Sequence, residues 1–334
     1  MQTPCVYKLV SPKRLVVECD QESILPPEAD QILMETVVSA ISPGTELSAW
    51  RGDPPLRPTT NIYPRLMGYC NVARVTQVGH NVTDWKPGDM VLSHSSHRSH
   101  DKISANDILC KIPLGADPVL GSTVYLFHLG YSACLKANVQ AGHSVAVVGL
   151  GTLGLTSAAV ANLSGAIVNG YSDQKPPSEA FRLSEVHSKK NVRKLSYADV
   201  VIITSNKWSD WKLALELARP GGVVAVLSFP GRGQAACDEN PLDSKYFYDK
   251  QLTLMACGQV PDLQVSPEEV RFTLKRNCSF LLKKILDGRL PAQALIDEIR
   301  DAKELPSLYR ELALSRRGSG TVILDWTGNH LVQS

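Results

Sequence analysis

The sequence predicts an α/β protein in which a β-rich block is joined to a doubly wound parallel sheet. Its 334 residues exceed what one hydrophobic core usually serves, so we expect two domains. The first third is rich in β-branched residues interrupted by Pro, Gly and Asp, which is typical of strands. From about residue 120, short apolar runs alternate with helical stretches, and this alternation is typical of a parallel sheet covered by helices.

The β-rich block is expected to contain little helix. Its strand-like stretches are partly alternating in polarity and cover residues 14–20, 31–42, 71–79 and 107–113. A further stretch, 84–94, reads as a turn that opens into a strand. We therefore expect an all-β unit at the beginning of the chain.

The second block begins with "SVAVVG" at 144–149, a continuous apolar run suited to a strand buried on both faces. Further strands and helices are predicted after it, with strands at 167–172, 198–205, 221–228 and 251–258 and helices at 150–166 and 211–218. Helices at 267–288 and 302–315 and a last strand at 320–326 complete the chain. This order predicts a Rossmann-type sheet followed by a mainly helical tail.

Composition excludes several classes of function. The formal charge of +2 is too balanced to indicate a nucleic-acid or membrane-surface partner. The start of the chain lacks the pattern of a signal peptide, and no apolar stretch approaches the roughly 18 residues of a membrane span. The eight cysteines are scattered without a CxxC pair, as in reduced cytosolic proteins. We expect a cytoplasmic protein that acts on a small molecule.

Gly149, Gly151 and Gly154 form a G-x-G-x-x-G motif between a buried strand and a helix, with Thr152 and Leu153 inside it. In such a motif the first glycine permits a tight turn, the second lets a pyrophosphate approach the backbone, and the third allows close helix–strand packing. The N-terminus of the helix offers free N–H groups and the positive end of its dipole. The setting favours a dinucleotide cofactor over a plain glycine-rich turn.

The second strand of this unit bears on which nicotinamide cofactor binds. NAD sites usually end this strand with an acidic residue that binds the ribose 2′-hydroxyl, and here the equivalent position is Ser172. A serine tolerates the 2′-phosphate of NADP, and Lys175 and Arg182 follow closely enough to pair with it. Asp173 lies one residue away and would serve NAD after a small shift of register. We favour NADP(H) over NAD(H).

The order of these blocks, with "PGTELSAWRGD", "MGYCNVARVTQVG", "WKPGDMVL", "VAVVGLGTLGL" and "ARPGGVVAVLS", resembles the medium-chain dehydrogenase/reductase superfamily. The resemblance implies a GroES-like catalytic domain, formed by residues 1–125 and 259–334, around a Rossmann cofactor domain at 126–258. It implies that Ser205 reaches the nicotinamide side and that the backbone at Leu227 and Ser228 holds the carboxamide. It also implies a homodimer that pairs through "QLTLMACG".

The zinc-dependent branch of that superfamily has three catalytic ligands. The resemblance aligns Pro43 with the first, Tyr69 and Cys70 with the histidine and acid of the second motif, and Val124 with the third. Proline and valine cannot bind a metal, and "HSSHRSHDKISANDIL" replaces the longer lobe that carries a structural zinc. The chain therefore looks zinc-free on both counts.

Without zinc, hydrogen-bond donors would have to stabilise a developing oxyanion. The resemblance places Thr45 at the hydroxyl of the proton relay, and the phenol of Tyr69 faces the substrate as a donor. Glu46 would orient either group or act as acid or base. Alternatively, Thr45 caps a turn and Tyr69 fills the core.

The stretch "HSSHRSH" contains His94, His97 and His100. In a continuous strand His94 and His100 would lie about 20 Å apart, too far to share one ion. The open interpretations are surface histidines, a metal site, or one or two histidines lining the cleft as a neutral donor or general acid, for which His97 and His100 fit best. His128 is a further candidate near the cleft.

These features favour a zinc-independent, NADP(H)-dependent oxidoreductase that transfers hydride between nicotinamide and a carbonyl/alcohol pair of a small metabolite. An enoyl- or quinone-type reductase of activated C=C bonds is the alternative within the same superfamily. A non-catalytic NADPH-binding sensor, and a metal enzyme that uses Cys70 with the histidines, are alternatives of other classes.

Overall fold

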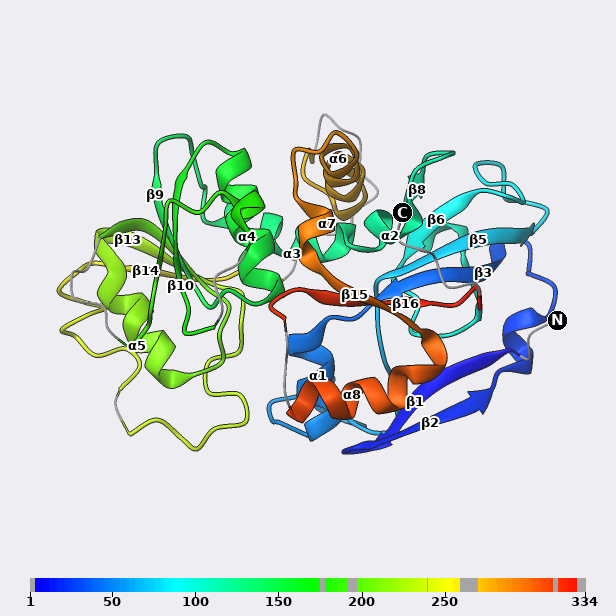
Figure 1. Cartoon of the computed structure of the whole chain (residues 1–334), viewed down its shortest axis with the longest axis horizontal. Helices are drawn as coiled ribbons and strands as arrows, with labels where there is room; N and C mark the ends of the chain where they lie inside the picture. Colours follow the sequence, from blue (N-terminus) through cyan, green and yellow to red (C-terminus); the bar gives the residue numbers. More distant parts are fainter. Residues whose placement is uncertain are drawn as a thin grey trace.

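The computed structural model describes residues 4–174, 178–190, 197–238, 240–258, 270–314 and 318–328. Two lobes lie side by side, and helices α3 and α6 lie between them (Figure 1). The middle of the chain forms one lobe, whereas both ends contribute to the other. Within the described ranges, no helix combines the length and the apolar character needed to cross a bilayer.

The lobe formed by the middle of the chain is built on a six-stranded parallel sheet. In spatial order its strands are β11 (Glu185–His187), β10 (Ile167–Tyr171), β9 (Ser144–Val148), β12 (Ala198–Ile203), β13 (Ala218–Val226) and β14 (Thr253–Ala256). Alternate residues of β9 enter two different cores, Val145 and Val147 on one face and Ala146 and Val148 on the other. Because both faces are covered, this strand is apolar throughout.

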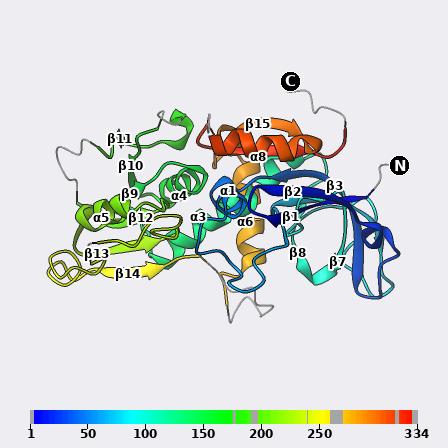
Figure 2. The ribbon, with the colours of Figure 1, turned by 90° about the horizontal axis from the view of Figure 1, so that it is seen from below.

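Helices cover the two faces of that sheet. Helix α4 (Thr152–Leu163) and helix α3 (Val124–Lys136) contribute to one core, and α5 (Trp208–Leu217) contributes to the other. Helix α6 (Leu274–Leu286) packs against α3 and against strand β8 (Ile108–Ile112) of the other lobe, so it joins the lobes (Figure 2).

The second lobe holds a seven-stranded mixed sheet and a small three-stranded sheet. The larger sheet runs β15 (Ile296–Asp301), β16 (Thr321–Asp325), β3 (Gln31–Ala40), β5 (Asn71–Val78), β6 (Met90–Ser93) and β8, with β7 (His100–Ser104) also paired to β3. The smaller one runs β2 (Arg14–Cys19), β1 (Cys5–Ser11) and β4 (Arg65–Leu66). Because β16 pairs antiparallel with β3, the end of the chain returns to its beginning.

The remaining described elements are helical: α1 (Pro43–Arg51), α2 (Pro118–Ser122), α7 (Ala292–Leu295) and α8 (Leu305–Leu314), with single 3₁₀ turns at Gln21–Ile24, Ala105–Asp107, Glu179–Phe181 and Ala302–Glu304. Helix α1 was not predicted from the sequence. A proline in its first turn and Gly52, in the left-handed conformation at its end, bound it. Helix α1 matters because it carries Thr45 and Glu46.

The predicted fold class is confirmed: a β-rich unit accompanies a doubly wound parallel sheet. The stretch 94–99 does not continue the strand before it, because β6 ends at Ser93 and β7 begins at His100. The domain boundaries at 125 and 258 stay predictions, and residue 125 lies just inside α3.

Candidate active site

The glycine motif forms a tight turn between β9 and α4. Gly149 has φ of +94°, a conformation that favours glycine. A Cβ at Gly154 would lie 1.8 Å from the carbonyl oxygen of Gly149, so only glycine lets the helix approach the turn. Gly151 occupies the N-cap of α4 and accordingly leaves the first N–H groups of the helix free for an anion.

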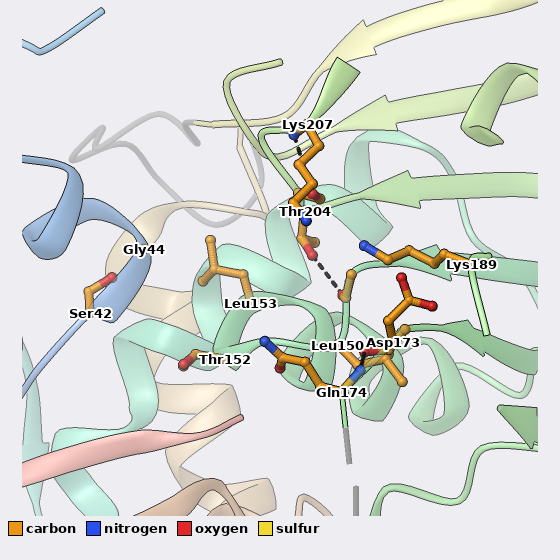
Figure 3. Close-up of a pocket in the computed structure, with 14 residues that line it drawn as sticks. Ser42, Gly44, Leu150, Thr152, Leu153, Asp173, Gln174, Lys189, Thr204 and Lys207 are labelled. Atoms are coloured by element: carbon orange, nitrogen blue, oxygen red, sulfur yellow. Dashed lines mark hydrogen bonds between the residues drawn. The ribbon is translucent and has the colours of Figure 1, made fainter. Parts of the chain in front are cut away.

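A cavity of about 300 Å³ opens beside this turn (Figure 3). One wall is the cofactor lobe, and the other is the start of α1 with its N-cap Ser42. The described residues that line it are Ser42, Gly44, Gly149, Leu150, Gly151, Thr152, Leu153, Ser172, Asp173, Gln174, Lys189, Thr204, Ser205 and Lys207. The arrangement fits a dinucleotide, because a glycine turn and a helix N-terminus face this cavity.

Most of the predicted cofactor residues meet at this cavity. Thr152 donates to the carbonyl oxygen of Gly320 at 2.5 Å and so ties the turn to the catalytic lobe. Leu227 and Ser228 are not among the described residues that line the cavity. Lys175 lies outside the described residues.

An acidic and a basic side chain, Asp173 and Lys189, line the cavity close to Ser172. Ser172 is buried, and its hydroxyl accepts a hydrogen bond from the backbone of Gln174. Burial raises the pKa of Asp173, but a hydrogen bond from Ser188 and the nearby Lys189 outweigh it, and the pKa is lowered overall. Lys189 pairs with the buried Asp210 at 2.7 Å.

On the catalytic side, Tyr69 lies against the start of α1. Its phenol donates to Ser42 Oγ at 2.5 Å. Burial is the main cause that raises its pKa, and hydrogen bonds with Ser42 and Thr45 partly oppose this. The phenol therefore stays protonated at neutral pH and acts as a hydrogen-bond donor.

Next to Tyr69 is an aromatic cluster. Tyr125 packs edge-on against Tyr69 and His94 and stacks on His128. His128 is buried, and neither ring nitrogen has a hydrogen-bond partner among the described residues. Burial, and secondarily His94, lower the pKa of His128 to about 4, so this imidazole is neutral at physiological pH.

Glu46 is the centre of a buried polar network behind the cavity. Its carboxylate accepts from the Ser42 backbone N–H at 2.6 Å and from the Tyr309 hydroxyl. Its Oε2 also lies 2.9 Å from Nε2 of His97, whose Nδ1 lies 2.9 Å from Ser39 Oγ. All five residues are buried.

The hydrogen-bond donors of this network converge on the Glu46 carboxyl group. Trp326 Nε1, which can only donate, lies 2.9 Å from Ser39 Oγ. A hydroxyl oxygen has a second lone pair, so Ser39 can either donate to His97 Nδ1 or accept from it, and in both cases His97 Nε2–H donates to Glu46. Glu46 receives every donor, as an ionised carboxylate does. The network therefore anchors the buried Glu46 carboxyl group within the first turn of α1.

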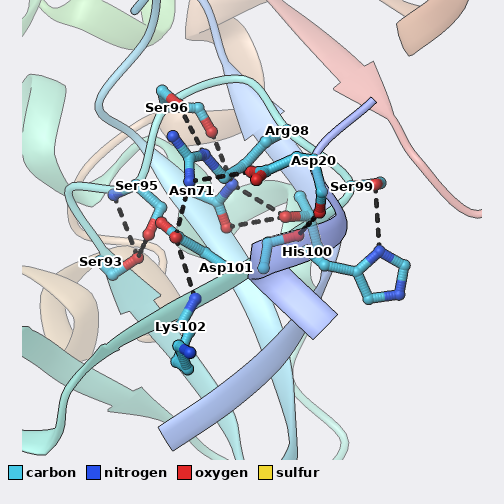
Figure 4. Close-up of polar contacts among 12 residues, drawn as sticks. Asp20, Asn71, Ser93, Ser95, Ser96, Arg98, Ser99, His100, Asp101 and Lys102 are labelled. Atoms are coloured by element: carbon cyan, nitrogen blue, oxygen red, sulfur yellow. Dashed lines mark hydrogen bonds and ion pairs between the residues drawn. The ribbon is translucent and has the colours of Figure 1, made fainter. Parts of the chain in front are cut away.

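The three histidines of "HSSHRSH" lie in three different surroundings. His94 is exposed against Tyr125, and His97 is fully buried in the network. A Cβ at Gly68, whose φ is +89°, would lie 2.6 Å from the His97 ring. His100 contacts Ser99 and points away from the polar group around Asn71 and Arg98 that holds this loop (Figure 4).

The side chains at the aligned positions do not fit the catalytic zinc of the zinc-dependent dehydrogenases that the sequence resembles. Pro43 and Val124 have no atom that binds a metal. Cys70 is buried, and burial and Glu46 raise the pKa of its thiol, which disfavours the thiolate that metals bind. Across the described ranges, no three His, Cys, Asp or Glu side chains are grouped to hold an ion.

Sequence reasoning missed Ser42, Ser39, Tyr309 and Tyr125. Ser42 was read as the end of a strand, although a serine directly before Pro-Gly is a typical N-cap signal. Tyr309 comes from α8, more than 260 residues after Glu46, and no local pattern could pair the two.

A scan against protein-family models matched none. L-galactonate-5-dehydrogenase of Escherichia coli is 28% identical over 196 residues, which are 50% of this chain and 56% of that protein. The chain thus spans little more than half the length of this relative. Among solved structures, galactitol-1-phosphate dehydrogenase from Escherichia coli aligns with a TM-score of 0.75 and 16% identity, covering 96% of this chain and 99% of that one. A putative zinc-binding dehydrogenase from Sinorhizobium meliloti bound to NADP aligns with a TM-score of 0.78 and 18% identity, covering 97% and 100%.

These likenesses confirm the predicted resemblance to the medium-chain dehydrogenase/reductase superfamily, of the alcohol-dehydrogenase-like type. The chain has the two-part fold of that superfamily, with a GroES-like unit and a Rossmann unit.

Proposed function

We propose that the protein is a nicotinamide-dependent oxidoreductase that acts on a carbonyl/alcohol pair of a small polyhydroxylated metabolite. The observation that carries this proposal is the meeting of two features at one cavity. The glycine turn forms one wall, and Ser42, bonded to the Tyr69 phenol, forms the other. The relatives named for L-galactonate and galactitol-1-phosphate support the substrate class.

When bound, the nicotinamide supplies or accepts the hydride. Since Tyr69 donates to Ser42 Oγ, the Ser42 hydroxyl hydrogen is free to point into the cavity. There it donates to the substrate oxygen on which negative charge develops, and the Tyr69 phenol polarises it from behind. Thr45, which also bonds Tyr69, fixes the phenol.

Glu46 and His97 act as positioning residues in this proposal. Glu46 holds the Ser42 backbone N–H, and His97 holds Glu46. Neither is among the described residues that line the cavity. His100, on β7, has no described contact with the cavity, so we assign it no role.

We favour NADP(H) as the cofactor. Ser172 stands where NAD sites carry an acid, and Lys189 lines the cavity beside Asp173 at the same rim. The Lys189 ammonium suits a 2′-phosphate, whereas the Asp173 carboxylate opposes it.

We also propose that the reaction needs no zinc, because the resemblance aligns Pro43 and Val124 with ligand positions and the Tyr69–Ser42 pair can take over oxyanion stabilisation. The buried thiols of Cys70, Cys110 and Cys134 form no disulfide, which supports a cytoplasmic setting. Strand β14 is an edge of the parallel sheet and is the proposed homodimer contact.

The test is a panel of polyols, hydroxy acids, polyol phosphates, enones and quinones, assayed with NADP(H) and NAD(H). We expect turnover with the alcohols or their carbonyl products. Turnover with enones alone would establish the C=C reductase, and NADPH binding without any turnover would establish a sensor.

The Tyr69→Phe variant tests the mechanism within the same panel. We expect kcat to fall about 100-fold, as for the loss of an oxyanion donor, because the Ser42 hydroxyl loses the phenol that orients and polarises it; the Kd for NADPH should be unchanged. Tyr131→Phe, whose ring packs on Phe280, is the matched control. Equal kcat in both variants would remove Tyr69 from the mechanism.

A further inference from the structure

Arg232 is a buried cation that none of the features described above explains. It is only 9% exposed, and its guanidinium lies 3.6 Å from the centre of the Phe229 ring. Its Nε is buried and has no hydrogen-bond partner among the described residues. A buried donor without an acceptor is costly, so a ligand that supplies an acceptor there would be favoured.

Arg65 repeats this feature on the opposite lobe. Its Nε and Nη1 are buried and equally lack a partner in the described part of the chain, while its Nη2 donates to the Arg57 carbonyl at 2.8 Å. Arg65 lies in β4, four residues before Tyr69. Two guanidinium groups, one from each lobe, therefore hold unused donors.

The backbone brings these two segments together. The turn that carries Arg232 follows β13, where ligands of doubly wound sheets bind beyond the carboxyl ends of the strands. Gly233 N–H donates to the Pro54 carbonyl at 2.8 Å, so this turn touches the loop that leads to Arg65. A Cβ at Gly233 would come within 3.0 Å of Asp53.

Burial and charged neighbours from the opposite lobe shift the pKa of Arg232. Burial lowers the pKa of Arg232, and Arg65 and Arg57 lower it further, while Asp53 and Tyr69 raise it. Asp53 is already paired with Arg51 at 2.7 Å. The junction is therefore rich in positive charge and close to Tyr69, whose phenol polarises the proposed donor Ser42.

We propose that Arg65 and Arg232 form an oxyanion site that holds a carboxylate or phosphate of the substrate between the two lobes. Guanidinium N–H groups match the paired oxygens of both anions. The substrate would then be an anionic polyol or hydroxy acid, with its reacting carbon presented to the Tyr69–Ser42 pair. That the bound anion belongs to the substrate rests on the proposed oxidoreductase function. The anion site itself can be tested without that function.

The experiment measures binding of inorganic phosphate and of malonate, each by calorimetry, to the NADPH-saturated protein. Arg65→Gln and Arg232→Gln are compared with Arg219→Gln, an exposed arginine paired with Asp199 elsewhere in the cofactor lobe. We expect each site variant to weaken anion binding about 10-fold or more, because a charge-assisted hydrogen bond is lost. The Arg219→Gln control should bind both anions with the affinity of the unaltered protein. Preference for phosphate or malonate tells which anion the site accepts.

The Arg232→Lys variant keeps the positive charge but lacks the paired N–H donors of the planar guanidinium. It replaces Arg232→Gln in the experiment if that variant does not fold. Anion affinity that is absent, or equal in all variants, would overturn the inference. So would neutral polyols that react with the kcat/KM of the matching acids and phosphates. Anion binding that depends on both arginines, with no turnover of any panel compound, would instead uphold the site and overturn the oxidoreductase proposal.

Discussion

The two walls of the cavity are built by different means. The cofactor wall is backbone: Gly149, Gly151 and Gly154 shape it within six consecutive residues. The catalytic wall is held by side chains from distant parts of the chain, with Glu46 bonded to Tyr309 and His97. A backbone site depends on the absence of side chains, whereas a side-chain network depends on every member. We therefore expect the two walls to fail differently when altered.

The largest effect is expected for Glu46→Gln. An amide offers one acceptor oxygen to three donors and places its own N–H₂ against another donor. Breaking a buried charged network costs about 3–5 kcal/mol, which should appear as a large loss in the free energy of unfolding by urea denaturation. Glu35→Gln, on an exposed position of β3, is the control. Similar stability for both variants would show that the network does not hold the catalytic wall.

A second effect concerns His128, which stacks on Tyr125. Because burial lowers its pKa to about 4, the unfolded chain binds a proton between pH 6.5 and 4 that the folded chain does not. Stability is therefore lost as pH falls through this window, by up to about 3 kcal/mol, and the loss levels off below pH 4. Denaturation at several pH values should show a smaller acid loss in His128→Phe. An identical pH profile for both proteins would contradict the assignment of a neutral buried imidazole.

Gly154→Ala tests the backbone wall. The added Cβ meets the Gly149 carbonyl oxygen, which belongs to the rigid turn and cannot rotate away. Overpacking costs roughly 1–3 kcal/mol, so NADPH affinity measured by fluorescence should fall about 10- to 100-fold. Gly258→Ala, with open space at its Cβ, is the matched control. Unchanged affinity in Gly154→Ala would separate the glycine motif from cofactor binding.

The smallest effect is expected at the rim. Ser172→Asp places a carboxylate where the 2′-phosphate would lie and offers an acceptor to the ribose 2′-hydroxyl. The ratio of kcat/KM for NADPH to that for NADH should fall about tenfold, while Ser184→Asp, exposed and outside the described cavity lining, should leave it unchanged. A ratio that already favours NADH in the unaltered protein would point to Asp173 as the ribose ligand.

The difference between the walls also explains what the sequence could predict. The strand, glycine motif and helix at 144–163 form a local pattern whose order alone implies the turn. The side chains around Glu46 come from β3, α1, α8 and the loop after β6, and only tertiary packing unites them. His97 illustrates the limit: its sequence suggested a cleft or metal residue, and the structure places it fully buried behind α1. Arg65 and Arg232 gave no sequence signal because neither lies in a motif.

The central claim is that hydrogen-bond donors, not zinc, stabilise the oxyanion at the catalytic wall. The most direct test measures zinc content and NADPH-linked turnover on the same purified preparation, before and after treatment with a chelator. We predict turnover with far less than one zinc per chain and no loss after chelation. One zinc per chain, with activity that chelation abolishes and added zinc restores, would contradict the claim.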